Sequence, residues 1–213
     1  HYNDTWVRDY GFLSCGSGLD VQPIEFEFNG WGQKFAATKD NQINQHVLSQ
    51  LCQMPIKAVD FVLEGGALEI DQQGTLLSTE LCLANPKRNA NKSINSYQQD
   101  FATYLGAKKN IILQHGHLEG DDTDGHIDTL VRFTPNNGLV IQSAFNRPDD
   151  SHFEGLSALV KECQQALPLH QIFELPLPHI INEEGDRLPA SYANFLISNG
   201  HILCPIYHQP EDT

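Results

Sequence analysis

The segment from Gly120 to Asp128 carries the residues of this chain that are best suited to chemistry. It reads Gly-Asp-Asp-Thr-Asp-Gly-His-Ile-Asp, so four carboxylates and one imidazole lie within nine residues. If this segment ends in a strand, His126 and Asp128 are two residues apart and point to the same face. A carboxylate there can hold a cationic substrate while the imidazole transfers protons. The alternatives for such a segment are a polar turn and a carboxylate loop that binds a metal ion.

Two other segments contribute polar residues that can meet this one. They are Asn3 to Gly11, which contains Trp6 and Asp9, and the run Glu64-Gly65-Gly66 after an apolar stretch. We expect both segments to face the same centre as residues 120–128, because repeated convergence of carboxylates is typical of a binding site. The set predicted to converge is Asp9, Glu64, Asp122, His126 and Asp128.

Such a set of side chains is suited to a guanidinium substrate. Two carboxylates that flank a planar cation can each accept paired N–H bonds, which is the geometry of guanidinium recognition. Resonance makes the central carbon of guanidinium a weak electrophile, so its hydrolysis requires a strong nucleophile, normally a thiolate. A histidine can protonate the leaving nitrogen and then activate water. Trp6 can flank the hydrocarbon tail of the substrate.

Composition restricts the class of partner. The net charge of −14 and the pI near 4.9 argue against nucleic acid and anionic membranes, and favour a small cationic molecule. The sequence has no apolar run of eighteen residues and no basic-then-apolar leader, so we expect a cytoplasmic protein and leave a homo-oligomer open. Five single cysteines indicate reduced thiols, mostly small core residues: Cys15, Cys52, Cys82, Cys163 and Cys204.

The elements that position these residues recur along the chain. Four hairpins of two apolar strands are predicted, with turn glycines at Gly18, Gly74, Gly138 and Gly200. Apolar residues at helical spacing follow the first three hairpins, around 43–51, 94–105 and 156–163. A further apolar strand follows each helix, at 59–63, 110–113 and 171–175. The predicted unit is therefore strand, loop, hairpin, helix.

Units of this kind must pack side by side to bury their sheets, and radial packing around an axis gives a propeller-like ring. We predict an α+β fold of this type as a single domain over 1–213, with partial units at about 1–54, 55–107, 108–167 and 168–213. The first unit has no leading strand and the fourth has no helix. We therefore expect native sequence to be missing at both ends. A mixed α+β domain with coincidental spacing is the alternative.

Four ordered motifs resemble the agmatine deiminase and bacterial peptidylarginine deiminase family, and the likeness extends over nearly the whole chain. The motifs are Trp-Val-Arg-Asp-Tyr-Gly at 6–11, Phe-Asn-Gly-Trp-Gly at 28–32, Glu-Gly-Gly at 64–66 and Asp-Thr-Asp-Gly-His-Ile-Asp at 122–128. The resemblance implies a five-bladed α/β propeller of the pentein type, with a site on the pseudo-fivefold axis and neither metal nor cofactor.

The resemblance also implies roles for individual residues. Asp9 and Asp128 grip the guanidinium, His126 is the acid–base, and Trp6 lines the substrate channel. Asp122 matches a position that is usually glutamate in agmatine-specific members and helps to bind the far end of the substrate. Glu64 and Gly65 complete the substrate-binding set. The implied reaction converts agmatine into N-carbamoylputrescine and ammonia through a cysteine-bound thiouronium, as a step of putrescine synthesis.

The chain departs from the family in the motif of the catalytic cysteine, and this departure bears on the choice among possible functions. The nucleophile of the family is a cysteine in a Gly-Gly-x-x-His-Cys stretch, which this chain does not contain, and Cys204 is predicted to be a core residue. We expect the cysteine in a further unit and the 213 residues alone to be inactive. Peptidyl arginine is an alternative substrate, and an inactive guanidinium-binding remnant is an alternative of another class. A metal hydrolase that uses His115, His117, Glu119 and His126 together with the Asp cluster as ligands is the remaining one.

Overall fold

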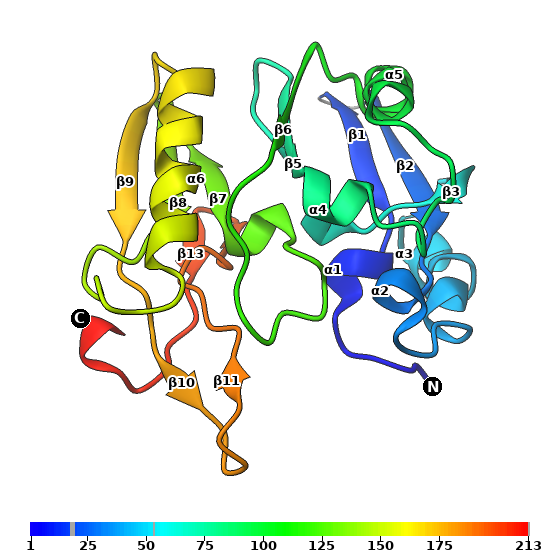
Figure 1. Cartoon of the computed structure of the whole chain (residues 1–213). Helices are drawn as coiled ribbons and strands as arrows, with labels where there is room; N and C mark the ends of the chain where they lie inside the picture. Colours follow the sequence, from blue (N-terminus) through cyan, green and yellow to red (C-terminus); the bar gives the residue numbers. More distant parts are fainter. Residues whose placement is uncertain (18–19, 53, 213) are drawn as a thin grey trace.

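The computed structural model describes residues 1–17, 20–52 and 54–212 of the chain. Within these residues the protein has an α+β fold built on small β-sheets and without a closed barrel (Figure 1). Three sheets have three strands each and two are isolated hairpins. Their strands are β1 (Leu13–Ser17), β2 (Asp20–Glu27) and β3 (Lys57–Val62); β4 (Glu69–Ile70), β5 (Thr75–Thr79) and β6 (Lys109–Leu113); β7 (Val131–Thr134), β8 (Gly138–Gln142) and β9 (Gln171–Leu175); β10 (Ile180–Ile181) and β11 (Arg187–Leu188); β12 (Leu196–Ser198) and β13 (His201–Leu203).

The three larger sheets share one topology. In each, an antiparallel hairpin is followed by a helical segment and then by a third strand, which pairs in parallel with the second strand of that hairpin. A parallel pair needs such a crossover connection. Each strand that we expected to lead a unit therefore belongs to the sheet of the preceding hairpin, since β3 pairs with β2 and not with β4. The structural unit is hairpin, helix, strand.

The predicted helices are present. The second and third are α5 (Ile94–Leu105) and α6 (Phe153–Ala166), and the first is an irregular run of η1 (Asp40–Gln42), η2 (Asn44–Leu48) and α3 (Ser49–Cys52). Ser93 caps the start of α5, and Gly106 ends it with a left-handed φ of 70°. Short turns complete the chain: α1 (Val7–Tyr10), α2 (Gly30–Gln33), η3 (Gly65–Ala67), α4 (Glu80–Leu83), η4 (Ile127–Thr129) and η5 (Pro210–Asp212).

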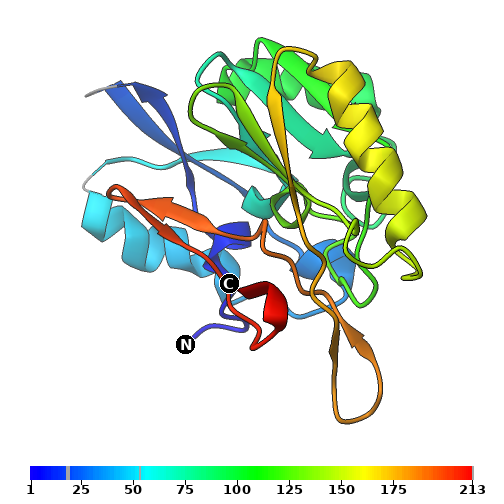
Figure 2. The same cartoon turned by 90° about the vertical axis from the view of Figure 1, so that its left-hand side faces the viewer.

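The two larger of three apolar clusters among the described residues stabilise this arrangement. One lies between α6 and the sheet of β7, β8 and β9, where Leu156, Leu159 and Ile141 are fully buried. The other joins the first two sheets through Tyr97 and Phe101 of α5. The β10–β11 hairpin projects from the body in both views (Figure 2). Among the described residues, no helix has the length and apolar character that crossing a membrane requires.

Buried Arg132 connects the second and third sheets with the segment before β12. Its Nε donates to Glu69 Oε2 at 2.9 Å, and its Nη1 donates to the carbonyl oxygens of Phe195 and Ala193 at 2.7 and 3.2 Å. The guanidinium also lies over the Phe195 ring. Because a buried charge is costly unless it is paired, these contacts fix how neighbouring units meet.

The prediction of a turn glycine in the third hairpin needs correction. In the third hairpin the positive φ angles belong to Asn136 (62°) and Asn137 (56°) and not to Gly138, because asparagine also tolerates the left-handed region. Gly74 and Gly200 have the predicted positive φ, and Gly18 lies outside the described residues.

Cysteine burial also differs in part from expectation. Cys82 and Cys163 are buried free thiols and Cys15 is half-buried, whereas Cys204 is exposed and not a core residue. The last hairpin, β12–β13, pairs with no third strand among the described residues, and its residues Ile202 and Leu203 are likewise 66% and 60% exposed. The side chain of Cys52 lies outside the described structure.

Candidate active site

The segment 120–128 is a loop that ends in the 3-10 turn η4, and not the strand predicted from its alternation. Asp121 stabilises the loop, since its carboxylate accepts bonds from the backbone amides of Thr123 (2.8 Å) and Gly125 (2.7 Å). This use of an aspartate side chain is characteristic of turns and competes with strand formation. His126 and Asp128 are nevertheless both buried, with exposed fractions of 1% and 7%.

Asp9, at the end of the short helix α1, meets these two residues from the other side of the site. Its Oδ1 accepts a hydrogen bond from the Gly66 amide at 2.8 Å and lies 3.5 Å from His126 Nδ1. Its Oδ2 accepts a bond from the Trp31 indole at 2.9 Å. Asp9 is 7% exposed, so both donors act in a largely dry environment where they orient the carboxylate strongly.

The three groups converge on the surface of Gly66. A methyl group on this glycine would lie 2.6 Å from Asp9 Oδ1, 2.6 Å from His126 Nδ1 and 2.8 Å from Asp128 Oδ2. These distances are shorter than real Cβ contacts, so a side chain at this position would force the three groups apart. We call Asp9, Gly66, His126 and Asp128 the floor of the site.

A cavity of about 460 Å³ opens above the floor. Asp9, His126 and Asp128 line it together with Trp6 and Asp122, so five of the predicted site residues share one cavity. Asp4, Trp6, Phe35 and Asp122 line the same cavity and are more exposed than the floor, and we call these four the rim; the exposed Arg8 lines the cavity beside them. Trp6 is 62% exposed and Phe35 is 48% exposed. A volume of this size accommodates a small ligand.

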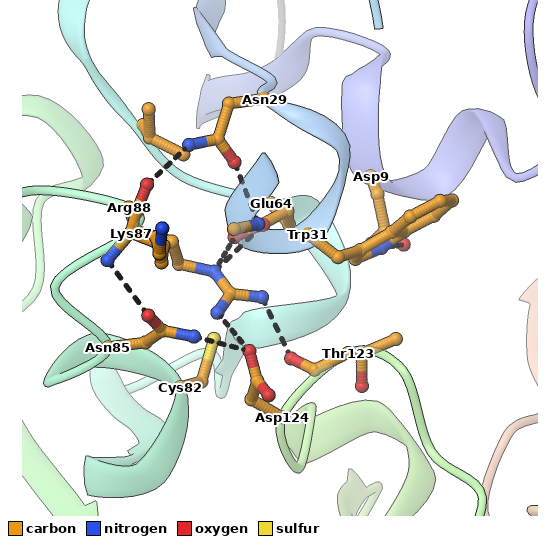
Figure 3. A network of polar contacts seen from close by, with 12 residues as sticks. Asp9, Asn29, Trp31, Glu64, Cys82, Asn85, Lys87, Arg88, Thr123 and Asp124 are labelled. Carbon is orange, nitrogen blue, oxygen red and sulfur yellow. Dashed lines mark hydrogen bonds and ion pairs between the residues drawn. The ribbon is translucent and has the colours of Figure 1, made fainter. Parts of the chain in front are cut away.

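Glu64 and Gly65 do not line this cavity. Glu64 is fully buried, and both of its carboxylate oxygens accept hydrogen bonds from Arg88 Nε, at 2.9 and 3.0 Å (Figure 3). Gly65 packs beneath the floor, where a methyl group would meet the carbonyl oxygen of Arg8 at 2.1 Å. Both residues therefore support the site from behind and are not placed to touch a ligand.

Arg88 connects this support to the acidic loop. Besides Glu64, it donates from Nη1 to Asp124 Oδ2 at 2.6 Å and from Nη2 to the Thr123 carbonyl at 2.8 Å (Figure 3). Its side chain is only 1% exposed. Burial lowers the pKa of Arg88, but its interactions with Cys82, Glu64 and Asp124 outweigh burial and raise the pKa, so the guanidinium stays charged and holds the loop against Glu64.

Burial and neighbouring charges shift the pKa values of His126 and Asp128, the two floor residues opposite Asp9. Burial by itself lowers the pKa of His126, but the charge of Asp9 and the contacts with Cys82 and Glu64 outweigh it and raise the pKa to about 10. Burial raises the pKa of Asp128 to about 6, although the charge of His126 opposes this. At neutral pH the floor thus holds a protonated imidazole and carboxylates that can receive a cation.

The metal-ligand set His115, His117, Glu119 and His126 is not assembled. His115, His117 and Glu119 are exposed, whereas His126 is buried. Among the described residues, the group of potential ligands close enough to share an ion is Glu64, Cys82 and His126, whose ligand atoms lie within 4.8 Å of one another. Because Arg88 already occupies both oxygens of Glu64, this group is part of the support of His126.

Known proteins that are similar to this chain include deiminases. A model of the Porphyromonas-type peptidyl-arginine deiminase family matches residues 1–213. A Vibrio parahaemolyticus protein provisionally named agmatine deiminase is 35% identical, over 99% of this chain and 65% of its own length. The agmatine deiminase of Pseudomonas aeruginosa is 31% identical, over 99% of this chain and 64% of its own length.

A solved structure has the same fold. It is a cysteine-to-serine variant of C. jejuni agmatine deiminase with substrate bound, which superposes with a TM-score of 0.93 at 33% identity. The match covers 100% of this chain and 63% of that one. The chain spans about 65% of the length of the curated relatives that it matches. The family model covers every residue, and the chain therefore belongs to the Porphyromonas-type peptidyl-arginine deiminase family.

Proposed function

We propose that this site binds a guanidinium group for hydrolytic deimination, with agmatine as the substrate and N-carbamoylputrescine and ammonia as the products. The observation that carries the proposal is that Asp9, His126 and Asp128 converge beside Gly66 and line one cavity of about 460 Å³. Deimination matches the family, and agmatine is the substrate named for its relatives in Pseudomonas aeruginosa and C. jejuni.

The two carboxylates supply the binding energy. Asp9 and Asp128 face the cavity with buried oxygens and can each accept N–H bonds from a planar guanidinium. Trp31 and the Gly66 amide hold Asp9 in a fixed orientation, so little rearrangement is needed when the cation binds.

His126 supplies the protons. Its raised pKa depends largely on the negative charge of Asp9, and a bound guanidinium neutralises part of that charge. Substrate binding should therefore lower the pKa of His126 towards neutrality and release its proton to the nitrogen that leaves as ammonia. The neutral imidazole can then take a proton from the water that completes the hydrolysis.

The nucleophile is proposed to be a cysteine thiolate from sequence outside these 213 residues. None of the described cysteines lines the cavity, and Cys82 is buried behind His126 with a pKa that burial raises. Because a thiol with a raised pKa is a poor nucleophile, we assign Cys82 to the support of His126. The thiolate adds to the guanidinium carbon, ammonia leaves, and water releases the carbamoyl product.

The rim favours agmatine over peptidyl arginine. Two carboxylates, Asp4 and Asp122, line this part of the cavity against one exposed cation, Arg8, and a carboxylate there attracts the terminal amine of agmatine. The exposed rings of Trp6 and Phe35 can flank the four-carbon chain or stack on its amine. A peptide bond at the same position would offer no cation to these groups.

The shared topology of the three larger sheets supports a further proposal about architecture. We infer that the units surround a pseudo-fivefold axis as in an α/β propeller, with the floor near that axis. Buried Arg132 links successive units, as such packing requires.

The proposal separates into a binding test and a turnover test. The 213-residue chain should bind agmatine in calorimetry but release no ammonia, whereas a polypeptide extended through the cysteine segment should release it. Ammonia release by the 213 residues would contradict the assignment of the nucleophile. Absence of binding to both agmatine and an arginine-containing peptide would contradict the guanidinium site, and preference for the peptide would change the substrate.

A further inference from the structure

The short element α2 is a left-handed turn between the floor and the rim. Gly30, Trp31, Gly32 and Gln33 have φ angles of 71°, 55°, 77° and 65°. Residues with side chains adopt this region rarely, so the surroundings must hold Trp31 and Gln33 there. A methyl group on Gly30 would lie 2.0 Å from the carbonyl oxygen of Phe35, so the turn closes too tightly for another residue.

The inner end of the turn contacts the floor. The indole of Trp31, which is 5% exposed, donates to Asp9 Oδ2 at 2.9 Å. Figure 3 shows Trp31 and Asp9 side by side at the edge of the Arg88 network. The position of the turn is therefore coupled to the orientation of the carboxylate that receives the guanidinium.

The outer end of the turn contacts the acidic loop. Lys34 Nζ donates to the carbonyl oxygen of Asp122 at 2.5 Å and to Asp124 Oδ1 at 2.7 Å. The other oxygen of Asp124 accepts bonds from Arg88 and Asn85, so this carboxylate is held from two sides (Figure 3). With Asp124 fixed in this way, the side chain of Asp122 lines the cavity.

We propose that the turn Gly30–Phe35 sets the distance between the guanidinium-binding floor and the amine-binding rim, with Lys34 as a residue that determines substrate length. Trp31 fixes one end of this distance at Asp9, and Lys34 fixes the other at Asp122. The inference rests on the proposed function, because it assumes that a guanidinium occupies the floor. It predicts selection for the number of carbons between guanidinium and amine.

The test compares guanidinoalkylamines with three, four and five methylenes, using calorimetry on the 213-residue chain. The unsubstituted protein should prefer agmatine, which has four, by roughly tenfold, as one methylene commonly allows. Lys34→Met should reduce this preference to about threefold or less and leave the affinity for butylguanidine, which has no amine, unchanged. A partly exposed ion pair has an effect of this modest size.

Lys39→Met is the matched control, because it removes the same charge five positions away and the described structure gives the Lys39 ammonium no hydrogen bond. It should retain the preference for agmatine. Equal affinity of the unsubstituted protein for all three lengths, or a preserved preference in Lys34→Met, would overturn the inference.

Hydrogen exchange tests the contact of Lys34 independently of any ligand. Amide exchange over residues 121–126 should accelerate in Lys34→Met and stay unchanged in Lys39→Met. Unchanged exchange in Lys34→Met would show that Lys34 does not hold the loop, which also overturns the inference. If no guanidine compound binds while exchange accelerates, the proposed function fails and the length selection fails with it, but the structural contact stands.

Discussion

The floor and the rim of the cavity differ in how firmly their side chains are held. On the floor, Asp9 accepts two hydrogen bonds and His126 is 1% exposed. On the rim, Trp6 is 62% exposed and Asp122 also faces solvent. Electrostatic interactions are stronger in the dry floor than at the screened rim. The floor is therefore suited to binding and proton transfer, and the rim to selecting among substrates that share a guanidinium.

The largest loss is expected from Gly66→Ala, which changes no charge but disrupts the whole floor. Its methyl group would lie within 2.8 Å of Asp9, His126 and Asp128, so these side chains must move apart. A displacement of about 1 Å commonly reduces function by roughly 100-fold. We expect agmatine binding, measured by calorimetry, to weaken by at least that factor.

Gly155→Ala in α6 is the control for this change. No atom lies within 4 Å of the methyl group that it adds, and alanine favours helix. It should bind agmatine as the unsubstituted chain does. If Gly66→Ala remained folded by circular dichroism and bound agmatine within about threefold of that value, the floor would not be the guanidinium site.

Removal of one floor charge should have the next largest effect. Asp9→Asn or Asp128→Asn leaves a buried cation without one of its partners, which costs about 2–5 kcal/mol, or ~30-fold or more in affinity. His126→Ala should instead retain agmatine binding and abolish turnover in the extended polypeptide, because it removes the proton donor and leaves both carboxylates. Equal losses of affinity in His126→Ala and Asp9→Asn would disprove this division of roles.

Lowering the pH should weaken agmatine binding because it protonates Asp128 of the floor, and not because of any change at the rim. Burial raises the pKa of Asp128 to about 6, so lowering the pH through 6 protonates the carboxylate that the guanidinium needs. In the free protein His126 gains no proton over this range, because its pKa is about 10. A fall of that pKa towards neutrality in the complex changes the affinity mainly above pH 7, so the loss below pH 6 reports Asp128. Affinity for agmatine should fall by up to about tenfold per pH unit below pH 6. In Asp128→Asn, calorimetry between pH 7 and 5 should show a much shallower dependence.

Most of the helices and strands could be predicted from local patterns. The third helix and its following strand were expected at 156–163 and 171–175, and the structure has α6 at Phe153–Ala166 and β9 at Gln171–Leu175. Their apolar spacing reflects burial against one core, which a single sequence displays directly. The pairing of each third strand with the preceding hairpin could not be predicted in this way, because it is a contact between distant segments.

In the site, too, the contacts between distant segments could not be predicted from local patterns. Asp9, Asp122, His126 and Asp128 do share one cavity, but Glu64 was expected to face the ligand and is instead bonded to Arg88. Arg88 lies 24 residues from Glu64 and 36 from Asp124, in a segment without periodicity, so no sequence signal pointed to it. Trp31 belongs to the Phe-Asn-Gly-Trp-Gly motif at 28–32, but its bond to Asp9 depends on a left-handed turn that residue types alone do not specify.

The smallest effect is expected from Asp122→Glu, which tests the rim without changing its charge. Asp122 is exposed, so solvent and salt screen its attraction for the terminal amine of agmatine. The extra methylene extends the carboxylate towards the same cation, and affinity should be preserved or improved by about two- to threefold. The affinity for butylguanidine should not change, because that compound has no amine for the rim to bind. A tenfold loss for both ligands would show that Asp122 acts on the floor, and the distinction between a floor that binds the guanidinium and a rim that selects its substituent would have to be abandoned.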